Sequence, residues 1–488
     1  MEFLELQSHI SPITDTSGVS RYNAAAYIQA IQKQWKPYFE LKAYKEFDVD
    51  FHKIVIDRIE RKDKEVFLPT GEIHTELGTG KQINVLEKQI VKVARLPIPY
   101  QQLIVNTATQ FLTGGKLNLV CDAKDDSQQA MFGQVKEIWK DNKLKFKNAS
   151  IATAMMSQLE VAEVWYRDID KKTKKEKLKV KILQPIDGFT FYPVFDALDD
   201  LIAFGVYWKG ADKTEYFDLY TDTEKRSHMK LRGQEWQLAV NEDGSPAIVE
   251  HGYGKIPVIY YTQLKAEWHP VQRLIERYEF LISNFADIND YNGSPILFTK
   301  GKTLSLPAKG QAGKVIENPD GDGDIKYVTW DQAPEAIKLE KDTLEKLINL
   351  MTQTVPFDID SMKGLGDLSG AAFDRILIGP NLKATQKLNG PYGEGLQRRN
   401  NFLVSAAPVV YPELTNAEET EVNIDQEIFK IDSQADYINL LIQANGGKAV
   451  ISQETAVALA GMVQDTKKEY DQIVKENDVL GSFAAGGI

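Results

Sequence analysis

The sequence predicts an α+β fold in which a β-rich region is followed by long helical segments. Short runs of β-branched and aromatic residues, separated by turns, fill the chain from Glu160 to Val240. Apolar residues then recur at helical spacing over Val271–Asn292, Pro334–Val355 and Ala371–Ala407. With 488 residues, 43% of them hydrophobic, the chain can form several cores, so we expect two to four structural regions.

The N-terminal part is predicted to be a helical arm from Ala24 to about Phe51, followed by charged, turn-rich sequence through Gly80. The segment Pro97–Leu119 starts with two prolines, continues at helical spacing and reaches Gly114-Gly115, which predicts a helix that leads into a strand. Another helix is predicted around residues 134–156.

The β-rich region is expected to be a mostly antiparallel meander, which the short strand Gly254–Tyr261 follows. The turn Asp168–Lys177 holds five lysines but no interleaved aromatic residue for base stacking, so a solvated hairpin tip is favoured over a nucleic-acid patch. The predicted strands are Glu160–Arg167, Leu178–Leu183, Gly188–Tyr192, Ile202–Trp208, Tyr216–Tyr220 and Glu235–Val240.

The helical half is expected to contain a hairpin of two long helices, with a small β insertion over residues 293–333 at its tip. A breaker-rich loop, Pro356–Gly370, precedes the third helical segment, where Pro380 and Pro391 should bend or interrupt the helix. The remainder is predicted as a strand, three helices and a frayed tail: Glu421–Phe429, Tyr437–Ala444 opened by Ser433, Glu454–Met462 opened by Ser452, Thr466–Glu476 and Gly481–Ile488.

Composition argues against several classes of protein. The 70 acidic residues exceed the 58 basic ones and give a net charge of −12, which disfavours a protein that binds nucleic acid tightly. The single cysteine, Cys121, cannot form an intrachain disulfide or a thiolate zinc site, and it fits a reducing compartment. Because the N-terminus lacks a basic signal-peptide region and no apolar run approaches about 20 residues, we expect a soluble protein without a membrane partner.

No cofactor, metal or catalytic site is predicted. Gly80-Lys81 and Gly301-Lys302-Thr303 lack the remaining residues of a phosphate-binding loop and are interpreted as turns. Asp320–Asp324 begins like a calcium loop, but Ile325 replaces the required glycine, so a solvated acidic loop is favoured and ion binding stays open.

Other candidate side chains have simpler explanations. The six histidines are scattered without zinc-binding spacing, and most are expected at the surface or in turns: His9, His52, His74, His228, His251 and His269. Paired carboxylates for a hydrolase could come from Asp196, Asp199 and Asp200, although a turn that uses their backbone hydrogen bonds is favoured.

The order of these elements resembles the phage portal family, in particular its Siphovirus-like branch. The resemblance spans about residues 90–476 and depends on the order and spacing of short stretches. These are Pro97–Leu117, Gly254–Ile259, Ile275–Asp290, Ser369–Ala372, and Ile451–Thr455 with Glu469 beyond it.

This resemblance implies a portal fold with a β-rich wing, stem helices, a β clip and a helical C-terminal crown. The implied regions are arm and wing 1–260, stem helices 261–292 and 334–355, clip 293–333, tunnel loop 356–370, long bent wing helix and return strand 371–430, and crown and tail 431–488.

Candidate functional residues follow from the same resemblance. The stem candidates are Glu276, Glu279, Asp287, Asp290, Lys341 and Glu345. The tunnel-loop candidates at the DNA channel are Asp358, Asp360, Ser361, Met362, Lys363, Leu365 and Asp367. The candidates for partner contacts in the clip are Lys300, Lys302, Lys309, Lys314, Asp320 and Asp322.

The resemblance further implies a ring, of twelve subunits in the virion, that carries double-stranded DNA during packaging and ejection. Its implied partners are the terminase large subunit, the head–tail adaptor, the major capsid protein and the scaffold, at the capsid vertex and in the host cytoplasm during assembly. We expect each long helix to bury its apolar stripe against a neighbouring copy. The acidic wall of the channel should let DNA slide, and gating should be coupled to a bend near Pro380.

Two alternatives stay open. The first is another structural oligomer of a virion, such as an adaptor or a capsid-associated protein. The second is a hydrolase that uses Asp196 or Asp199. A ring with an axial hole would distinguish the portal from the first, and activity lost on Asp196→Asn or Asp199→Asn would indicate the second.

Overall fold

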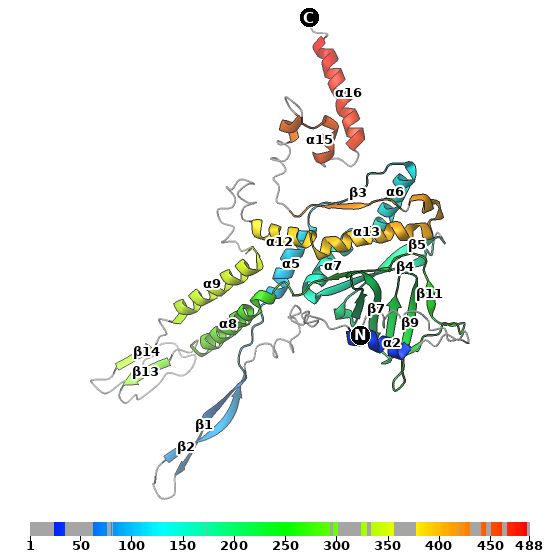
Figure 1. Cartoon of the computed structure of the whole chain (residues 1–488). Helices are drawn as coiled ribbons and strands as arrows, with labels where there is room; N and C mark the ends of the chain where they lie inside the picture. The colour runs from blue at the N-terminus through cyan, green and yellow to red at the C-terminus, as the bar shows by residue number, and fades with distance from the viewer. Residues whose placement is uncertain are drawn as a thin grey trace.

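The computed structural model confirms the α+β class: a central body of sheets and helices carries projections at both ends (Figure 1). The residues that it describes are 24–34, 62–75, 80, 82–172, 174–292, 296–300, 324–328, 333–355, 377–417, 419–429, 441–445, 450–460 and 466–485. Within these residues no helix is long and apolar enough to cross a membrane.

Two antiparallel sheets form the β-rich part. In the first, β4 (Glu160–Ile169) pairs with β5 (Glu176–Leu183) and β12 (Val258–Thr262). The second has the strand order β10-β9-β8-β7-β6, with β11 also paired to β9. Its strands are β6 (Thr190–Phe195), β7 (Leu201–Lys209), β8 (Glu215–Tyr220), β9 (Glu224–Lys230), β10 (Gln237–Leu238) and β11 (Ile248–Glu250).

The meander is therefore confirmed, and the lysine-rich turn is the tip of the β4–β5 hairpin. Two strands were missed. β9 has the charged sequence EKRSHMK and lacks an apolar face that alternation could reveal, and β11 has only three residues. Apolar residues of both sheets, including Val164, Phe191 and Phe204, pack between them. On the other side of the second sheet, α2 (Ala24–Gln34) buries Ile28 among these strands.

The main core lies among α5 (Tyr100–Thr113), α6 (Asp126–Asp141), α7 (Leu144–Gln158) and α13 (Pro391–Val410). As predicted, α5 leads into a strand, β3 (Leu117–Val120), which pairs with β15 (Asn423–Gln426). The single helix expected around residues 134–156 is two helices. The chain turns between them at Lys143, whose φ is 54°.

Two long helices project from this body. They are α8 (Gln272–Asn292) and α9 (Ala333–Thr352), and the described part of the segment between them contains the antiparallel strands β13 (Ile296–Lys300) and β14 (Asp324–Val328). A helical hairpin with a β tip was thus correctly predicted. Residues 261–271 are the end of β12 and a short turn, so the first helix begins at Gln272.

The third helical segment is interrupted, as the prolines indicated. Its described part, from residue 377, consists of α12 (Ile378–Leu388) and α13, and the chain breaks at Asn389-Gly390, directly before Pro391. Pro380 lies in the first turn of α12, where a missing N–H costs nothing. Residues 371–376 lie outside the described residues, so the bend expected near Pro380 stays a prediction. A further proline, Pro408, lies within α13.

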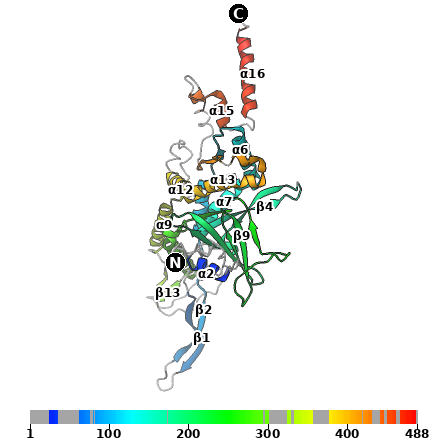
Figure 2. The ribbon, with the colours of Figure 1, turned by 45° about the vertical axis from the view of Figure 1, so that its right-hand side comes forward.

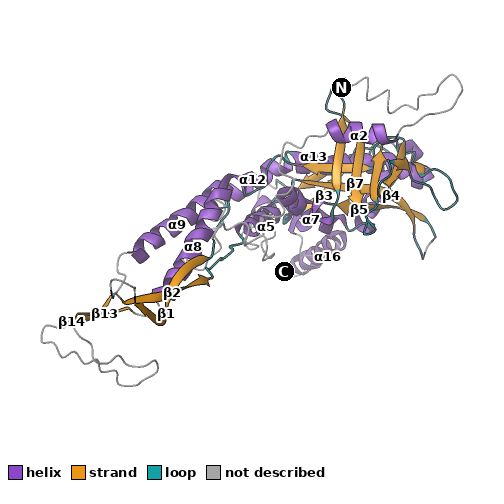
Figure 3. Ribbon diagram, turned by 90° about the horizontal axis from the view of Figure 1, so that it is seen from below, coloured by secondary structure: helices purple, strands orange, loops and turns teal. Residues whose placement is uncertain are grey.

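A second projection was not predicted at all. The segment expected to be turn-rich contains β1 (Lys64–Thr75), which forms a hairpin with β2 (Gln82–Val91), and this hairpin projects toward the same end as β13–β14 (Figures 1 and 3). Charged residues and a bulge between Pro69 and Ile73 hide its alternation in the sequence.

The C-terminal helices stand at the opposite end from β1–β2 (Figure 2). Ser452 caps α15 (Gln453–Ala460), accepting from the Thr455 N–H at 3.1 Å, as predicted. By contrast, α16 (Thr466–Ala485) continues beyond its expected end at Glu476. Residues 441–445 are also helical. The described residues further contain three short 3₁₀ turns: η1 (Pro185–Asp187), η2 (His269–Val271) and η3 (Pro412–Ala417).

Candidate assembly surface and channel segments

The apolar stripes of the long helices are buried within the chain itself. In α8, Ile275, Tyr278 and Leu281 are at most 7% exposed, and they share one core with Leu344 and Ile348 of α9. The expectation that a single subunit leaves these stripes exposed is therefore wrong. The cause is that α9 of the same chain packs along α8, and Tyr100 of α5 packs edge-to-face against Tyr278.

The same correction applies to the third segment, since the large apolar residues of α13 also lie in the main core, among them Tyr392, Leu396 and Phe402. Exposed apolar side chains lie elsewhere on these helices. Five of them on α9 and α12 are 57–71% exposed: Leu339, Leu350, Met351, Ile378 and Leu382. We call these five residues the α9/α12 surface. Exposed apolar side chains of this kind are typical of a surface that contacts another protein.

One polar face of α8 binds an extended segment of the chain. Its side chains at four-residue intervals accept backbone N–H groups from alternate residues 98, 96 and 94: Glu279 at 3.0 Å, Ser283 at 2.9 Å and Asp287 at 2.8 Å. Four helical residues rise about 6 Å, which is close to the span of two extended residues. This polar ladder fixes the base of the β1–β2 hairpin to α8.

The ladder changes the interpretation of the predicted stem charges. Glu279 is fully buried and, like Asp287, binds the chain's own backbone, so neither acts simply as a charge on the helix surface. A signal was present in the sequence, namely polar residues at positions i, i+4 and i+8, but the strand that they bind could not be identified.

The other stem candidates lie nearer the surface. Glu276 pairs with Arg273 at 3.0 Å, and Lys341 lies 3.6 Å from Glu345 within α9. Asp290 is exposed. The two helices are also joined by an ion pair between Arg277 and Glu340, at 2.7 Å.

A buried carboxylate joins the ends of α9 and α12. Glu267 pairs with Lys383 at 2.7 Å and with Lys387 at 2.5 Å, and the Lys383 ammonium also donates to the Thr352 carbonyl at 3.1 Å. Burial would raise the pKa of Glu267, but the two lysine charges outweigh it and lower the pKa. This clamp was missed because Glu267 is distant in sequence from its partners.

In the sequence, the clamp residues Thr352 and Lys383 flank the segment that contains the predicted tunnel loop. Its candidates Asp358, Asp360, Ser361, Met362, Lys363, Leu365 and Asp367 lie outside the described residues. So do the clip candidates Lys302, Lys309, Lys314, Asp320 and Asp322. Lys300 is the last residue of β13, and its backbone pairs with Asp324.

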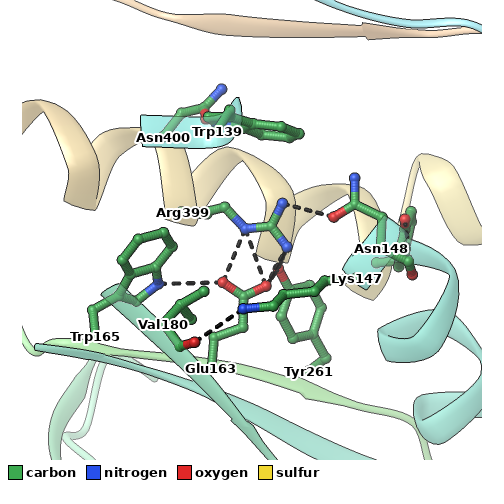
Figure 4. A network of polar contacts seen from close by, with 10 residues as sticks. Trp139, Lys147, Asn148, Glu163, Trp165, Val180, Tyr261, Arg399 and Asn400 are labelled. Carbon is green, nitrogen blue, oxygen red and sulfur yellow. Dashed lines mark hydrogen bonds and ion pairs between the residues drawn. The ribbon is translucent and has the colours of Figure 1, made fainter. Parts of the chain in front are cut away.

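A buried ion pair locks the first sheet to α13. Figure 4 shows the Glu163 carboxylate of β4 bound by the Arg399 guanidinium, whose Nε lies 2.9 and 3.0 Å from the two oxygens. Tyr261 donates to Glu163 at 2.8 Å, and Arg399 donates to Asn148 at 2.8 Å. Both charges are completely buried and multiply hydrogen-bonded, which favours a structural role.

The remaining chemical candidates also have structural partners. The Asp196 carboxylate accepts the backbone N–H groups of Leu198 and Asp200, at 2.8 and 2.9 Å, and so stabilises its own turn. Two histidines are core residues and not surface ones: His228 contacts the Phe217 carbonyl, and His251 the Thr221 carbonyl. Among the described residues no group of three His, Cys, Asp or Glu could hold a metal.

Comparisons with known proteins identify the family. No curated protein sequence matches the chain. Among solved structures, one described as "Neck of native GTA particle computed with C12 symmetry" matches at 11% identity and a TM-score of 0.38, over 75% of this chain and 89% of that one. Another, "Neck of empty GTA particle computed with C6 symmetry", matches at 10% identity and 0.37, with the same coverage. The sequence pattern of the family described as "Phage portal protein, SPP1 Gp6-like" matches residues 86–479, so the chain belongs to the phage portal protein family.

Proposed function

We propose that this chain is the subunit of a closed ring at the capsid vertex, through which double-stranded DNA is packaged and ejected. The observation that carries the proposal is the projecting α8–α9 hairpin, whose neighbouring α9/α12 surface is left uncovered within one chain. Exposed apolar side chains of this kind favour contact with another protein surface. In a ring, the next copy supplies that surface through a heterologous contact that closes on itself.

The regions take the roles expected of a portal. We assign the wing to residues 1–260 and 371–430, the stem to α8 and α9 within 261–292 and 334–355, the clip to 293–333, the tunnel loop to 356–370 and the crown to 431–488. The clamp around Glu267 supports the tunnel-loop assignment, because it holds together the two helices that flank the loop.

The charge of the chain suits DNA that must slide. Each attractive phosphate contact is repeated in every subunit of a ring, so a basic wall would hold the DNA. With a net charge of −12 per chain, a ring of twelve subunits repels phosphate overall. We therefore expect the tunnel loop to contact DNA transiently and sterically.

The partners follow from this position. We propose that residues 293–333 contact the terminase large subunit and the head–tail adaptor in turn, while the wing and crown face the major capsid protein and the scaffold. Such a subunit assembles in the host cytoplasm and then resides in the virion.

Native mass measurement and electron microscopy of the purified chain test the proposal. We expect a closed ring with an axial hole. Leu339→Gln and Leu350→Gln should each weaken assembly, whereas the matched control Lys338→Gln, on the same helix, should assemble like the wild type. A strictly monomeric wild-type protein, or an assembly without an axial hole, would overturn the proposal.

A further inference from the structure

One face of the β1–β2 hairpin carries a continuous apolar stripe. Register assigns the faces, because alternate residues of a strand share a face and directly paired residues lie on the same face. On β2, Leu86 and Ile90 share a face with Lys88, which pairs with Phe67. Beyond the bulge, the backbone of Ile73 pairs with that of residue 84, two residues before Leu86, so Ile73 lies on that face too.

This apolar face is exposed in the single chain. Phe67, Ile73, Leu86 and Ile90 are 55–67% exposed. Together they present on the order of 400 Å² of apolar surface, a size at which exposed patches mark interaction sites. The opposite face is more mixed: Val66 is only partly exposed and Val91 is 45% exposed, beside the polar and exposed Glu87 and Gln89.

An isolated hairpin of two strands is marginally stable in water, so it needs a covering surface. In the described structure it is held only at its base. There the polar ladder attaches residues 94–98 to α8, and Asp63 accepts from the Val93 N–H at 3.2 Å and pairs with Arg95 at 3.0 Å. The base is therefore fixed while the apolar face stays open.

We infer that the apolar face of β1–β2 packs against the neighbouring copy of this chain in the assembled ring. The inference rests on the proposed ring and adds a second intersubunit contact to the α9/α12 surface. The hairpin projects from the body toward the same end as α9, the helix that carries part of the α9/α12 surface (Figures 1 and 3).

The size of the patch favours a copy of this chain as the partner. A stable protein interface buries about 800 Å² on each partner, roughly twice what the hairpin face offers. The face is therefore too small to bind a separate protein firmly on its own. It suits an additional contact that forms once a larger interface has brought two copies together.

Charge supports the same partner. The charged residues of this face, Glu65 and Lys88, pair with each other at 2.7 Å, so the face has no net charge. Packing against another acidic chain then brings no like-charge repulsion from the face. A DNA contact would instead require an excess of basic residues.

Two neighbouring residues on opposite faces give a matched test. Ile90→Glu places a charge in the apolar face, and Gln89→Glu places the same charge on the other face. We expect Ile90→Glu to raise the protein concentration needed for half-assembly by about tenfold or more, and Gln89→Glu to leave it within about twofold of the wild type.

Photocrosslinking identifies the occupant. Phe67→p-benzoylphenylalanine is incorporated into rings assembled from a mixture of isotopically labelled and unlabelled subunits. We expect crosslinks between labelled and unlabelled chains, and few from the same group at position 89. Crosslinks confined to one chain, no crosslinks in assembled rings, or equal assembly of Ile90→Glu and Gln89→Glu would each refute the contact.

These outcomes are separate from failure of the proposed function. If the wild-type chain is monomeric, the ring itself is refuted. If wild-type rings form but position 67 does not crosslink to a second chain, the ring stands and the hairpin contact is wrong.

Discussion

Replacing Glu160 with glutamine is expected to stabilise the protein at alkaline pH. Glu160 lies in β4 at 1% exposure, and one of its carboxyl oxygens accepts from the Tyr260 hydroxyl at 2.8 Å. The other oxygen accepts no hydrogen bond within the described residues. Burial raises the pKa of Glu160 from 4.5 to about 7, although the hydrogen bond from Tyr260 acts in the opposite direction.

The sign of the effect follows from this shift. Because the folded pKa lies above the unfolded value, the contribution of Glu160 to the free energy of unfolding is fully present below about pH 4.5. It is lost as the pH rises through 7. A shift from 4.5 to 7 corresponds to a free energy of about 3 kcal/mol. Glutamine keeps an acceptor for Tyr260 and does not titrate. Glu160→Gln should therefore gain up to about 3 kcal/mol at pH 8 and little at pH 4.5.

Denaturant unfolding at pH 4.5 and pH 8 measures the difference, and the fluorescence of Trp165, buried in the same strand, reports on this core. Glu137→Gln is the control, because that carboxylate is exposed on α6. Equal stability of Glu160→Gln and the wild type at pH 8 would refute the reasoning. So would a gain of the same size at both pH values.

Three further changes test the polar contacts. Arg399→Met leaves the Glu163 carboxylate buried without its partner and should cost about 3–5 kcal/mol of unfolding free energy. In denaturant unfolding, adding Glu163→Gln should recover much of this loss. A double variant as unstable as Arg399→Met would contradict the coupling. Glu267→Gln should lower the free energy of unfolding by roughly 2 kcal/mol and speed amide hydrogen exchange in the first turns of α12. Unchanged exchange there would argue against the clamp. Ser283→Ala removes the middle acceptor of the polar ladder and should cost about 1–2 kcal/mol and speed exchange of the Leu96 amide; protection equal to wild type would exclude that hydrogen bond.

Local patterns predicted much of the fold. The helices α8 and α9 were located by apolar periodicity, because each packs one stripe into the core. The same periodicity could not say which surface covers that stripe. The burial of Tyr278 and Leu281 within their own chain, where a neighbouring copy was expected, depends on how distant segments pack.

The site residues were harder to predict, because their partners are far apart in the sequence. Glu163 and Arg399 are separated by 236 residues, and neither has a local signature. The β1–β2 hairpin was missed for a related reason. Its apolar residues face outward among charged ones, and the alternation breaks at the bulge after Pro69.

The polar ladder on α8 limits its own length. Four helical residues advance about 6.0 Å, and two extended residues about 6.6 Å, so each successive rung is out of step by about 0.6 Å. Over three rungs the mismatch is absorbed within ordinary hydrogen-bond tolerance, but a few more would separate donor from acceptor. The helix and the extended segment therefore stay in register over a short stretch only. The chain must part from α8 soon after Asp287, and that departure is what frees the hairpin to project.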